Sequence, residues 1–474
     1  MNVEDFIFGE PPREEHLTGL TIEGVLPAYV TGTYYLNGPA KFKTGSLSRN
    51  HWLDGDGMVR ALSMAGGKAD YRSRYVQTTR YREEQEAETP LYRSFGTAFD
   101  GDKLRKHLTL ESPANVSAYR YGDRLLAFGE QSLPWALDPV TLETSGEFDF
   151  GRFRPVTPLA AHGKTDPNTG EMFSFGIMFF GRRGKLFFHG FTPDLQPTVK
   201  GSASLPEGSY IHDFNLSQNY ACFHLAPYSL DVHQFVKNTL SLMDALTWHP
   251  DKPFELRIFC RKSGEQVAAL PLARKSFCLH VINTYEDGTD LIIDLVDTPE
   301  PFFDRYYARP LMFENLKPCA TIRFIVDTQT WTLRETRVYE SELHFDFPSI
   351  GAANYTTRYK HFWAAGMAAD PVPCPKFYNR LFRFDWDSGS YADSWQAGEK
   401  QVVGGEPLFI PDPAREKQGV VMCQTFCLES EKSGYLFFDA FNLAAGPIAS
   451  LSLPFYDPLG FHTSWKPAEA QGSL

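Results

Sequence analysis

The chain has 474 residues, of which 42% are hydrophobic and 15% aromatic, so it carries enough apolar material for a large core. Its formal net charge is −12 and no stretch is rich in Lys and Arg, which argues against nucleic-acid binding. We expect no membrane-spanning helix, because about 18 uninterrupted apolar residues occur nowhere. Seven cysteines without a C-x-x-C pair argue against a disulfide framework or a structural zinc site. Reduced thiols and a cytoplasmic location are therefore expected, and the acidic N-terminal sequence resembles neither a secretory signal nor a transit peptide.

Short apolar strands separated by polar turns recur along the chain. The turns are rich in Asp, Ser, Thr, Asn and Gly, which supply the hydrogen bonds and backbone conformations that hairpins need. The clearest examples, in chain order, are residues 135–150, 256–272, 322–339, 381–395 and 436–454. Because strand pairs can be added radially within one long domain, this pattern favours a β-propeller over a sandwich. We predict a single all-β domain over residues 1–474, although the pattern itself does not give the number of blades.

Four of the 13 histidines stand in a distinctive context. His162, His212 and His280 each lie at the edge of a strand-like apolar run beside a turn, and His462 follows an apparent terminal strand. In a propeller such positions gather at one end of the central channel, where each blade can donate one metal ligand. Their separation in the chain matches no local metal motif. A hydrogen-bonded structural role is the alternative for each histidine, and their positions alone leave both open.

A series of motifs runs from about residue 20 to the C-terminus. It begins with GTYYLNGPAKF and HWLDGDGMVRAL (32–42 and 51–62) and continues with NVSAYRYGDRLLAFGEQSLPWALDPVTLET (115–144). The later motifs are AHGKTDPNTGEMFSFG, IHDFNLSQNY, HVINTYEDG, GGEPLFIP and GFHTSWKP. In the content and order of these motifs, the chain resembles the carotenoid cleavage oxygenase family.

The resemblance implies a seven-bladed β-propeller in which loops and a few helices form a cap over a metal site on the axis. The ligands that it implies for Fe2+ are His162, His212, His280 and His462. In this family three carboxylates orient three of the imidazoles, which fixes their tautomers and raises their basicity. The motifs assign this role to Glu130, Asp346 and Glu406. Asp346 stands where the family has Glu. Since Asp is one methylene shorter, we expect its bond to the imidazole to be longer, shifted or bridged by water.

The resemblance further implies a non-haem iron(II) dioxygenase that cleaves a C=C bond of a carotenoid or apocarotenoid with O2 to give two carbonyl products. The alternative within the family is the cleavage of a stilbene or phenylpropanoid, as in lignostilbene dioxygenases. Family members that cleave phenolic substrates tend to have Lys directly before the first carboxylate, whereas this chain has Gly129. The small residue favours an apolar polyene. A retinoid isomerase and a metal-free scaffold propeller are also compatible with such a fold, and the retention of all four histidines disfavours the scaffold.

The expected partners are an apolar polyene and O2. A water-insoluble substrate must be taken from a membrane or micelle, so peripheral membrane contact is expected as well. One candidate for the apolar entry lip is the stretch 235–248, and the spacing of its apolar residues also predicts a helix over 232–248. The other candidate is FFDRYYARPLMF, residues 302–313. The alternative is that both stretches pack inside the cap.

Overall fold

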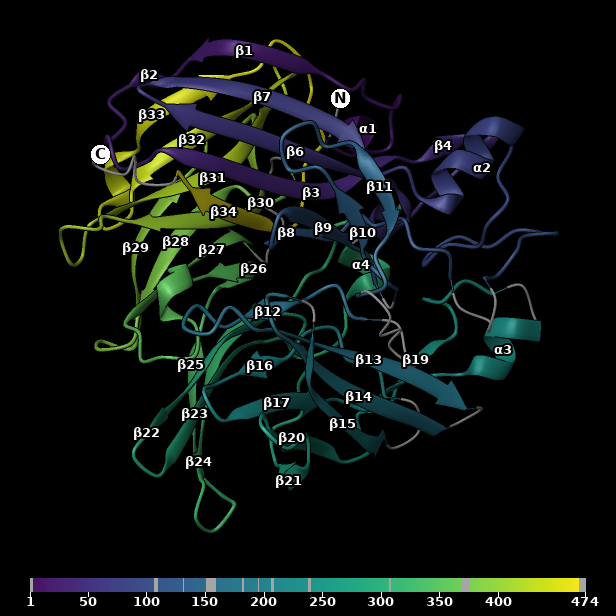
Figure 1. Ribbon diagram of the computed structural model, residues 1–474, viewed down its shortest axis with the longest axis vertical. Coiled ribbons are helices and arrows are strands. Elements are labelled where there is room, and N and C mark those ends of the chain that lie inside the picture. The colour runs from purple at the N-terminus through teal and green to yellow at the C-terminus, as the bar shows by residue number, and fades with distance from the viewer. Residues whose placement is uncertain are drawn as a thin grey trace.

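The computed structural model describes residues 3–105, 110–130, 132–150, 159–180, 183–194, 196–205, 209–237, 240–306, 308–368 and 376–468. Strands dominate, and they are arranged in sheets around a common centre (Figure 1). The helices are α1 (Val3–Ile7), α2 (Thr79–Ala87), α3 (Val232–Lys237) and α4 (Phe303–Tyr306), and the short 3-10 turns include η1 (Trp52–Asp54), η3 (Ala352–Asn354) and η4 (Leu443–Ala445). Among the described residues, no helix has the length and apolar character needed to cross a membrane.

Seven sheets of four or five antiparallel strands form the blades within the described part of the chain, which confirms the predicted seven-bladed propeller. The blade that contains both ends of the chain consists of β1 (His16–Thr21), β7 (Lys68–Tyr75), β6 (Asp56–Ala65), β3 (Gly32–Lys41) and β34 (Thr463–Pro467). The next consists of β8 (Ser117–Tyr121), β9 (Arg124–Phe128), β10 (Trp135–Leu137) and β11 (Thr144–Glu147). It is followed by β12 (Lys164–Thr165), β13 (Met172–Phe180), β14 (Arg183–Phe191) and β15 (Pro197–Leu205).

The remaining four blades continue in chain order. The fourth consists of β16 (Asn215–Leu216), β17 (Tyr220–Leu225), β20 (Phe254–Cys260) and β21 (Gln266–Leu272). The fifth consists of β22 (Val281–Asp287), β23 (Asp290–Asp297), β24 (Ala320–Asp327) and β25 (Thr332–Glu340). The sixth consists of β26 (Leu343–Ser349), β27 (His361–Ala368), β28 (Arg380–Asp385) and β29 (Ser390–Gln396). The seventh consists of β30 (Gln401–Pro411), β31 (Gly419–Cys427), β32 (Lys432–Asp439), β33 (Pro447–Ser452) and β2 (Glu23–Gly24). Outside the blades, β4 (Lys43–Thr44) pairs with β5 (Leu47–Ser48), and β18 (Tyr228–Leu230) with β19 (Leu246–Trp248).

Burial changes systematically from the first to the last strand of a blade. The first five residues of β22 are buried, whereas every residue of β25, the last strand of the same blade, is exposed or half-buried. β26 is likewise buried except at its first residue, and β29 alternates between exposed and half-buried residues. The first strands therefore lie innermost, and residues at their start point toward the centre of the ring.

The two ends of the chain close the ring. β34 pairs with β3 from Gly32 opposite Pro467 to Leu36 opposite Thr463, and β2 adds to the seventh blade by pairing with β33. The purple N-terminal strands and the yellow C-terminal strands consequently lie side by side (Figure 1). This closure brings the residues directly before β34 to the centre of the ring.

The helix predicted over 232–248 is only partly correct. α3 ends at Lys237, and residues 246–248 form β19, whose backbone hydrogen bonds to β18 replace those of a longer helix. Phe235 is buried, and Arg93 both covers its ring and donates a hydrogen bond to its carbonyl oxygen. Phe235 is therefore packed inside the protein, as the alternative for this stretch expected. Contact of the stretch 235–248 with a membrane stays a prediction.

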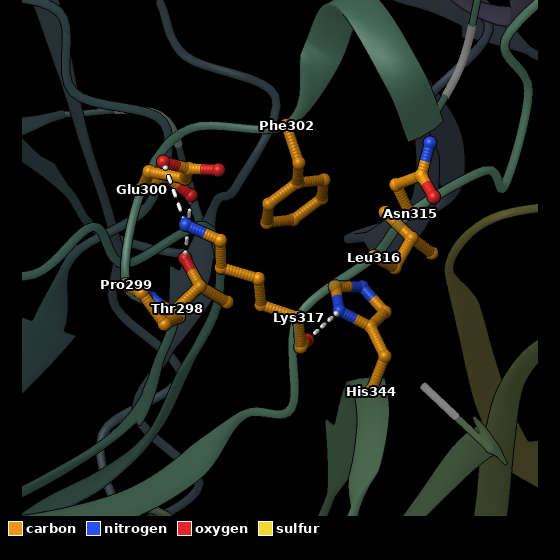
Figure 2. A pocket seen from close by; sticks show the side chains of 8 residues that line it. All are labelled: Thr298, Pro299, Glu300, Phe302, Asn315, Leu316, Lys317 and His344. Atoms are coloured by element: carbon orange, nitrogen blue, oxygen red, sulfur yellow. Dashed lines mark hydrogen bonds and ion pairs between the residues drawn. The ribbon is translucent and has the colours of Figure 1, made fainter. Parts of the chain in front are cut away.

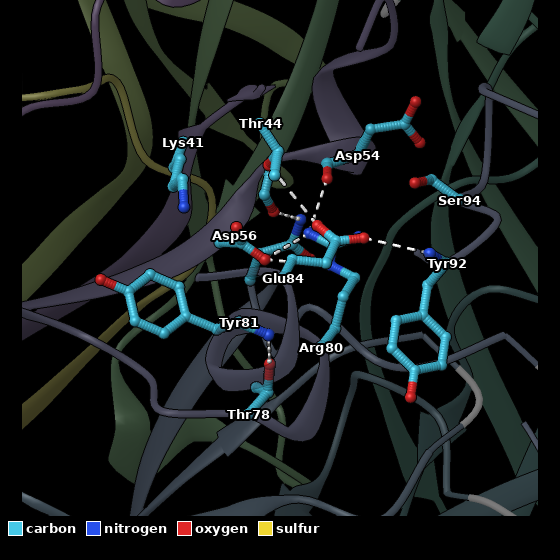
Figure 3. Close-up of polar contacts among 12 residues, drawn as sticks. Lys41, Thr44, Asp54, Asp56, Thr78, Arg80, Tyr81, Glu84, Tyr92 and Ser94 are labelled. Carbon is cyan, nitrogen blue, oxygen red and sulfur yellow. Dashed lines mark hydrogen bonds and ion pairs between the residues drawn. The ribbon is translucent and has the colours of Figure 1, made fainter. Parts of the chain in front are cut away.

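A buried ionic network ties α2 to the N-terminal strands. Glu84 in α2 accepts hydrogen bonds from Arg49 Nη2 at 2.8 and 2.9 Å and from two backbone N–H groups of the following loop at 3.0 Å. Arg80 donates to the Asp56 carboxylate at 2.6 Å and to the carbonyl oxygen of Asp54 at 2.8 Å (Figure 3). The side chains of both ion pairs are at most 1% exposed. Since Asp54 ends η1, the network fixes this turn, which contributes a side chain to the central cavity described below.

Candidate metal centre

The four histidines singled out in the sequence lie together at the centre of the ring. His162, His212 and His280 come shortly before β12, β16 and β22, the first strands of three successive blades, and His462 directly precedes β34. All four are buried, and one ring nitrogen from each lies within 4.8 Å of the others. The fold therefore assembles one cluster from segments that are remote in the chain.

The ring nitrogens at the centre of this cluster face one another, and one of them has no hydrogen-bond partner in the described structure. The Nε2 atoms of His162 and His212 are 3.0 Å apart. Nε2 of His280 is buried without a hydrogen-bond partner in the described structure, while its Nδ1 is bonded to a carboxylate. A buried polar atom without a partner costs about 1–3 kcal/mol, and a cation bound by the four nitrogens would remove that cost. Imidazole nitrogen is a good ligand for iron and for other transition metals, so this donor set fits such an ion.

Three carboxylates lie against the outer nitrogens of three of the imidazoles. Glu130 Oε1 is 3.1 Å from His212 Nδ1, and Glu406 Oε2 is 3.4 Å from His462 Nδ1. Asp346 Oδ1 is 2.6 Å from His280 Nδ1. An acceptor at Nδ1 favours the tautomer that carries its proton there, which leaves Nε2 free to bind a metal. These acids thus have the arrangement expected of residues that orient metal ligands.

The expectation of a longer, shifted or water-bridged contact for Asp346 is wrong. Its contact with His280 is direct and is the shortest of the three. A β-bulge between β26 and β27 follows Asp346 immediately, and Phe347 has a φ of 58°. Since a bulge bends its strand and redirects side chains, this backbone irregularity compensates for the missing methylene.

Replacing Asp346 by Asn should weaken metal binding about 10–100-fold, the usual cost of losing an acid that holds a metal-binding imidazole. The amide retains the shape of the side chain but removes the charge that favours the Nδ1 proton of His280. Competition with a chelator on anaerobically prepared protein measures the effect. Asp297→Asn is the matched control, because Asp297 is also buried but pairs with Arg274 instead. Unchanged affinity in Asp346→Asn would refute this role.

The charges around the imidazoles differ from one ring to the next. Burial lowers the pKa of His212, but the charge and hydrogen bond of Glu130, together with the charges of Asp213 and Asp346, outweigh burial, so that this pKa is raised overall. Burial, together with the neighbouring imidazoles, holds the pKa of His162 well below its usual range. Burial also lowers the pKa of His462, and Glu406 offsets this only in part. His162 and His462 are therefore neutral near pH 7, which is the state that binds a metal.

Two further residues near the cluster were not identified from the sequence. The Tyr210 hydroxyl donates to Glu130 Oε2 at 3.1 Å and lies 3.3 Å from His212 Nδ1. The Asp213 carboxylate lies 4.0 Å from His162 Nδ1. Both residues flank His212 in the segment YIHDF, and this proximity was the only signal in the sequence.

A mostly apolar cavity lies beside the histidines. The side chains that line it, apart from three of the histidines, are Leu53, Val116, Phe303, Phe347 and Phe461. The ring of Phe347 lies 5.4 Å from that of His280 and 5.3 Å from that of His462, between centroids. A wall of this kind suits an apolar ligand and excludes water from the nitrogens.

A second cavity lies next to residues 302–303, which also contribute to the wall of the first cavity. Figure 2 shows it between Phe302, His344 and the Lys317–Glu300 ion pair, whose charged atoms are 3.1 Å apart. Phe302, which lines this cavity, is followed directly by Phe303, which lines the other. Most of the large apolar side chains that the structure describes in 302–313 are buried, although Leu311 is 44% exposed. Membrane contact through this segment remains a prediction.

Comparisons with known proteins agree with this geometry. Residues 9–467 match the family described as RPE65, retinal pigment epithelial membrane protein. The chain is 28% identical over 461 residues to the apocarotenoid-15,15'-oxygenase of Synechocystis sp., which covers 94% of this chain and 92% of that protein. It is 31% identical over 501 residues to resveratrol cleavage oxygenase 1 of Aspergillus fumigatus, which covers 98% and 96%. The crystal structure of a cobalt-substituted Synechocystis apocarotenoid oxygenase matches with a TM-score of 0.87 at 25% identity, over 98% of this chain and 99% of that one. The chain belongs to the RPE65/carotenoid oxygenase family, a family of non-haem iron oxygenases that cleave carbon–carbon double bonds.

Proposed function

We propose that this protein is a non-haem iron(II) dioxygenase that cleaves a C=C bond of a carotenoid or apocarotenoid with O2 and releases two carbonyl products. The observation that carries the proposal is the buried cluster of His162, His212, His280 and His462. Three carboxylates against their outer nitrogens and an apolar cavity against their inner ones add to it.

The residues of the cluster fit ferrous iron. Four neutral imidazoles would hold the ion without reducing its positive charge, and Glu130, Asp346 and Glu406 would balance that charge from outside. The chemistry that bound iron supplies is the activation of O2, whose direct reaction with a closed-shell alkene is spin-forbidden. The protein's own part is to hold the imidazoles in one tautomer and to keep water away from the open side.

The cavity walls would decide which double bond is cut. Phe303, Phe347 and Phe461 line the cavity together with Leu53 and Val116, so that its wall is apolar beside the histidines. Fixing the reacting bond next to the metal converts a bimolecular encounter into an oriented one. The position of the substrate along this wall therefore selects the bond.

The residue before Glu130 is Gly129, and the lack of room for a larger side chain there supports an apolar substrate. At Gly129, even a Cβ atom would clash with Ser112 Oγ and would lie 3.0 Å from the backbone nitrogen of Ala114. A lysine side chain cannot be accommodated there without moving this loop. This position thus does not supply the cationic anchor that phenol-cleaving members of the family tend to have before the first carboxylate.

The second candidate is the cleavage of a stilbene or phenylpropanoid, and the Tyr210 hydroxyl favours it. This group is hydrogen-bonded to Glu130, and its ring packs edge-on against Phe303 with 5.7 Å between centroids. It could therefore exchange a hydrogen bond with a phenol that entered the cavity. The similarity to a resveratrol cleavage oxygenase points in the same direction.

Parallel turnover assays distinguish the two candidates. Protein loaded anaerobically with ferrous iron is exposed to O2 with an apocarotenal or with resveratrol, and the aldehydes are identified by mass spectrometry. We expect kcat/KM for the apocarotenal to exceed that for resveratrol by about tenfold or more, which is about 1.4 kcal/mol in transition-state stabilisation. Preferred cleavage of resveratrol would transfer the assignment to the second candidate. Iron bound with no cleavage of either substrate would contradict both.

A further inference from the structure

The carboxylate of Asp213 lies where three blades meet. Asp213 directly follows His212, and its side chain is only 3% exposed. β16 begins shortly after it and packs against β22 of the next blade, while β12 of the preceding blade begins at Lys164. The side chain is therefore surrounded by the first strands of three successive blades, the same strands that three of the histidines precede.

The two oxygens of Asp213 have partners on different blades. Oδ1 accepts a hydrogen bond from the Phe214 N–H at 2.8 Å and lies 2.9 Å from Lys164 Nζ. Oδ2 accepts from the Val281 N–H at 3.1 Å and from Lys164 Nζ at 3.1 Å. Val281 directly follows His280, and Lys164 comes soon after His162. One side chain thus links the neighbours of three histidines.

Asp213 does not hold an imidazole in the way that the other three acids do. Its Oδ1 is 4.0 Å from His162 Nδ1, which is beyond hydrogen-bond distance. The ammonium group of Lys164 lies closer, at 2.9 Å from Oδ1. The hydrogen bonds of Asp213 act on the cluster through the backbone positions of the segments that carry the histidines.

We propose that Asp213 is a positioning residue that sets the distances among three of the four histidines and thereby the affinity of the cluster for its metal. This inference rests on the proposed function. Both oxygens of Asp213 must accept hydrogen bonds. An asparagine side chain has one carbonyl oxygen, and its NH2 group would face the Lys164 ammonium and either the Val281 or the Phe214 N–H, all of which are donors. The contacts that link the blades would then be weakened or broken.

Cobalt(II) binding to the Asp213→Asn variant tests the proposal without reference to turnover. The visible spectrum of bound cobalt reports the arrangement of its ligands, competition with a chelator gives its affinity, and thermal unfolding of the metal-free protein gives the stability. Asp166→Asn is the matched control, because Asp166 is a buried acid that joins two of these three blades, the third and the fourth, through Arg261 at 2.5 Å and accepts from a backbone N–H at 2.8 Å. We expect Asp213→Asn to bind cobalt about tenfold or more weakly with a changed spectrum. Asp166→Asn should change the thermal stability but neither the cobalt affinity nor the cobalt spectrum.

The outcomes of this experiment separate the two proposals. An unchanged cobalt affinity and spectrum in folded Asp213→Asn would overturn the role of Asp213 and leave the metal centre intact. Wild-type protein that binds no cobalt would overturn the proposed function itself. If Asp213→Asn does not fold, Asp213→Glu decides, because it keeps the charge but lengthens the side chain by one methylene. A changed spectrum in Asp213→Glu supports the proposal, and an unchanged one overturns it.

Discussion

Replacing His280 by Ala should abolish turnover and deplete the protein of metal. The change removes one of four nitrogens, and it leaves the Asp346 carboxylate, which is 1% exposed, without its partner at 2.6 Å. A buried charge without a partner is costly, and the remaining three imidazoles form a weaker, more open site. We expect kcat/KM to fall by at least about a thousandfold, which is about 4 kcal/mol. Metal analysis and aldehyde production, measured on the same preparation, test this result.

A histidine outside the cluster provides the control for this variant. His224 lies in β17, is also buried, and is no member of the cluster. His224→Ala creates a cavity in the core, so it should lower the unfolding temperature while the folded protein retains its metal. Undiminished cleavage by His280→Ala would reject the assignment of the metal site.

Replacing Glu84 by Gln should destabilise the protein by about 3–5 kcal/mol, the usual cost of removing one partner from a buried ion pair. Arg49, which is fully buried, would lose its counter-charge, and the Gln NH2 group would face the guanidinium as a second donor. Since this pair ties α2 to the N-terminal strands, α2 should loosen first. Denaturant unfolding followed by fluorescence measures the change.

The pH dependence of this effect follows from the charge of Glu84. Burial alone would raise the pKa of Glu84, but Arg49, Arg80 and the two backbone N–H groups together outweigh burial and hold this pKa below its ordinary value of 4.5. A carboxyl group with a lower pKa in the folded state contributes stability above its unfolded pKa and loses that contribution as the pH falls through the folded one. The difference in the free energy of unfolding between wild type and Glu84→Gln should therefore have its full size at pH 7 and shrink below about pH 4.5.

An exposed ion pair gives the comparison for Glu84. Glu10 pairs with Lys43 at 2.9 Å, and their side chains are 83% and 49% exposed. Glu10→Gln should change the stability by no more than about 1 kcal/mol, since solvent screens such pairs. Equal effects of the two substitutions would show that the buried network contributes little to the stability of the cap.

Local patterns in the sequence predicted the class of fold, but they did not predict the strand pairing that closes the ring. Alternating apolar strands and polar turns indicated hairpins, and the family resemblance supplied the number of blades. The pairing of β34 with β3 joins the two ends of the chain, and no local pattern encodes it. The expected helix over 232–248 was interrupted for the same reason, because the pairing of β19 with β18 depends on tertiary contacts.

The sequence also singled out residues that the fold brings together, but it did not give their geometry. The four histidines were marked by motif, and the fold brings them together. The short contact of Asp346 could not be predicted, because it depends on a β-bulge rather than on the length of the side chain. Asp213 and Tyr210 were missed because their partners lie on other segments of the chain, so their roles become visible only after folding.

Anomalous diffraction at the iron edge, from crystals grown under anaerobic conditions with ferrous iron, tests the central claim most directly. We expect a single strong peak within bonding distance of the Nε2 atoms of His162, His212, His280 and His462. A map without a peak among these four rings, or with its only peak elsewhere in the protein, would contradict the account.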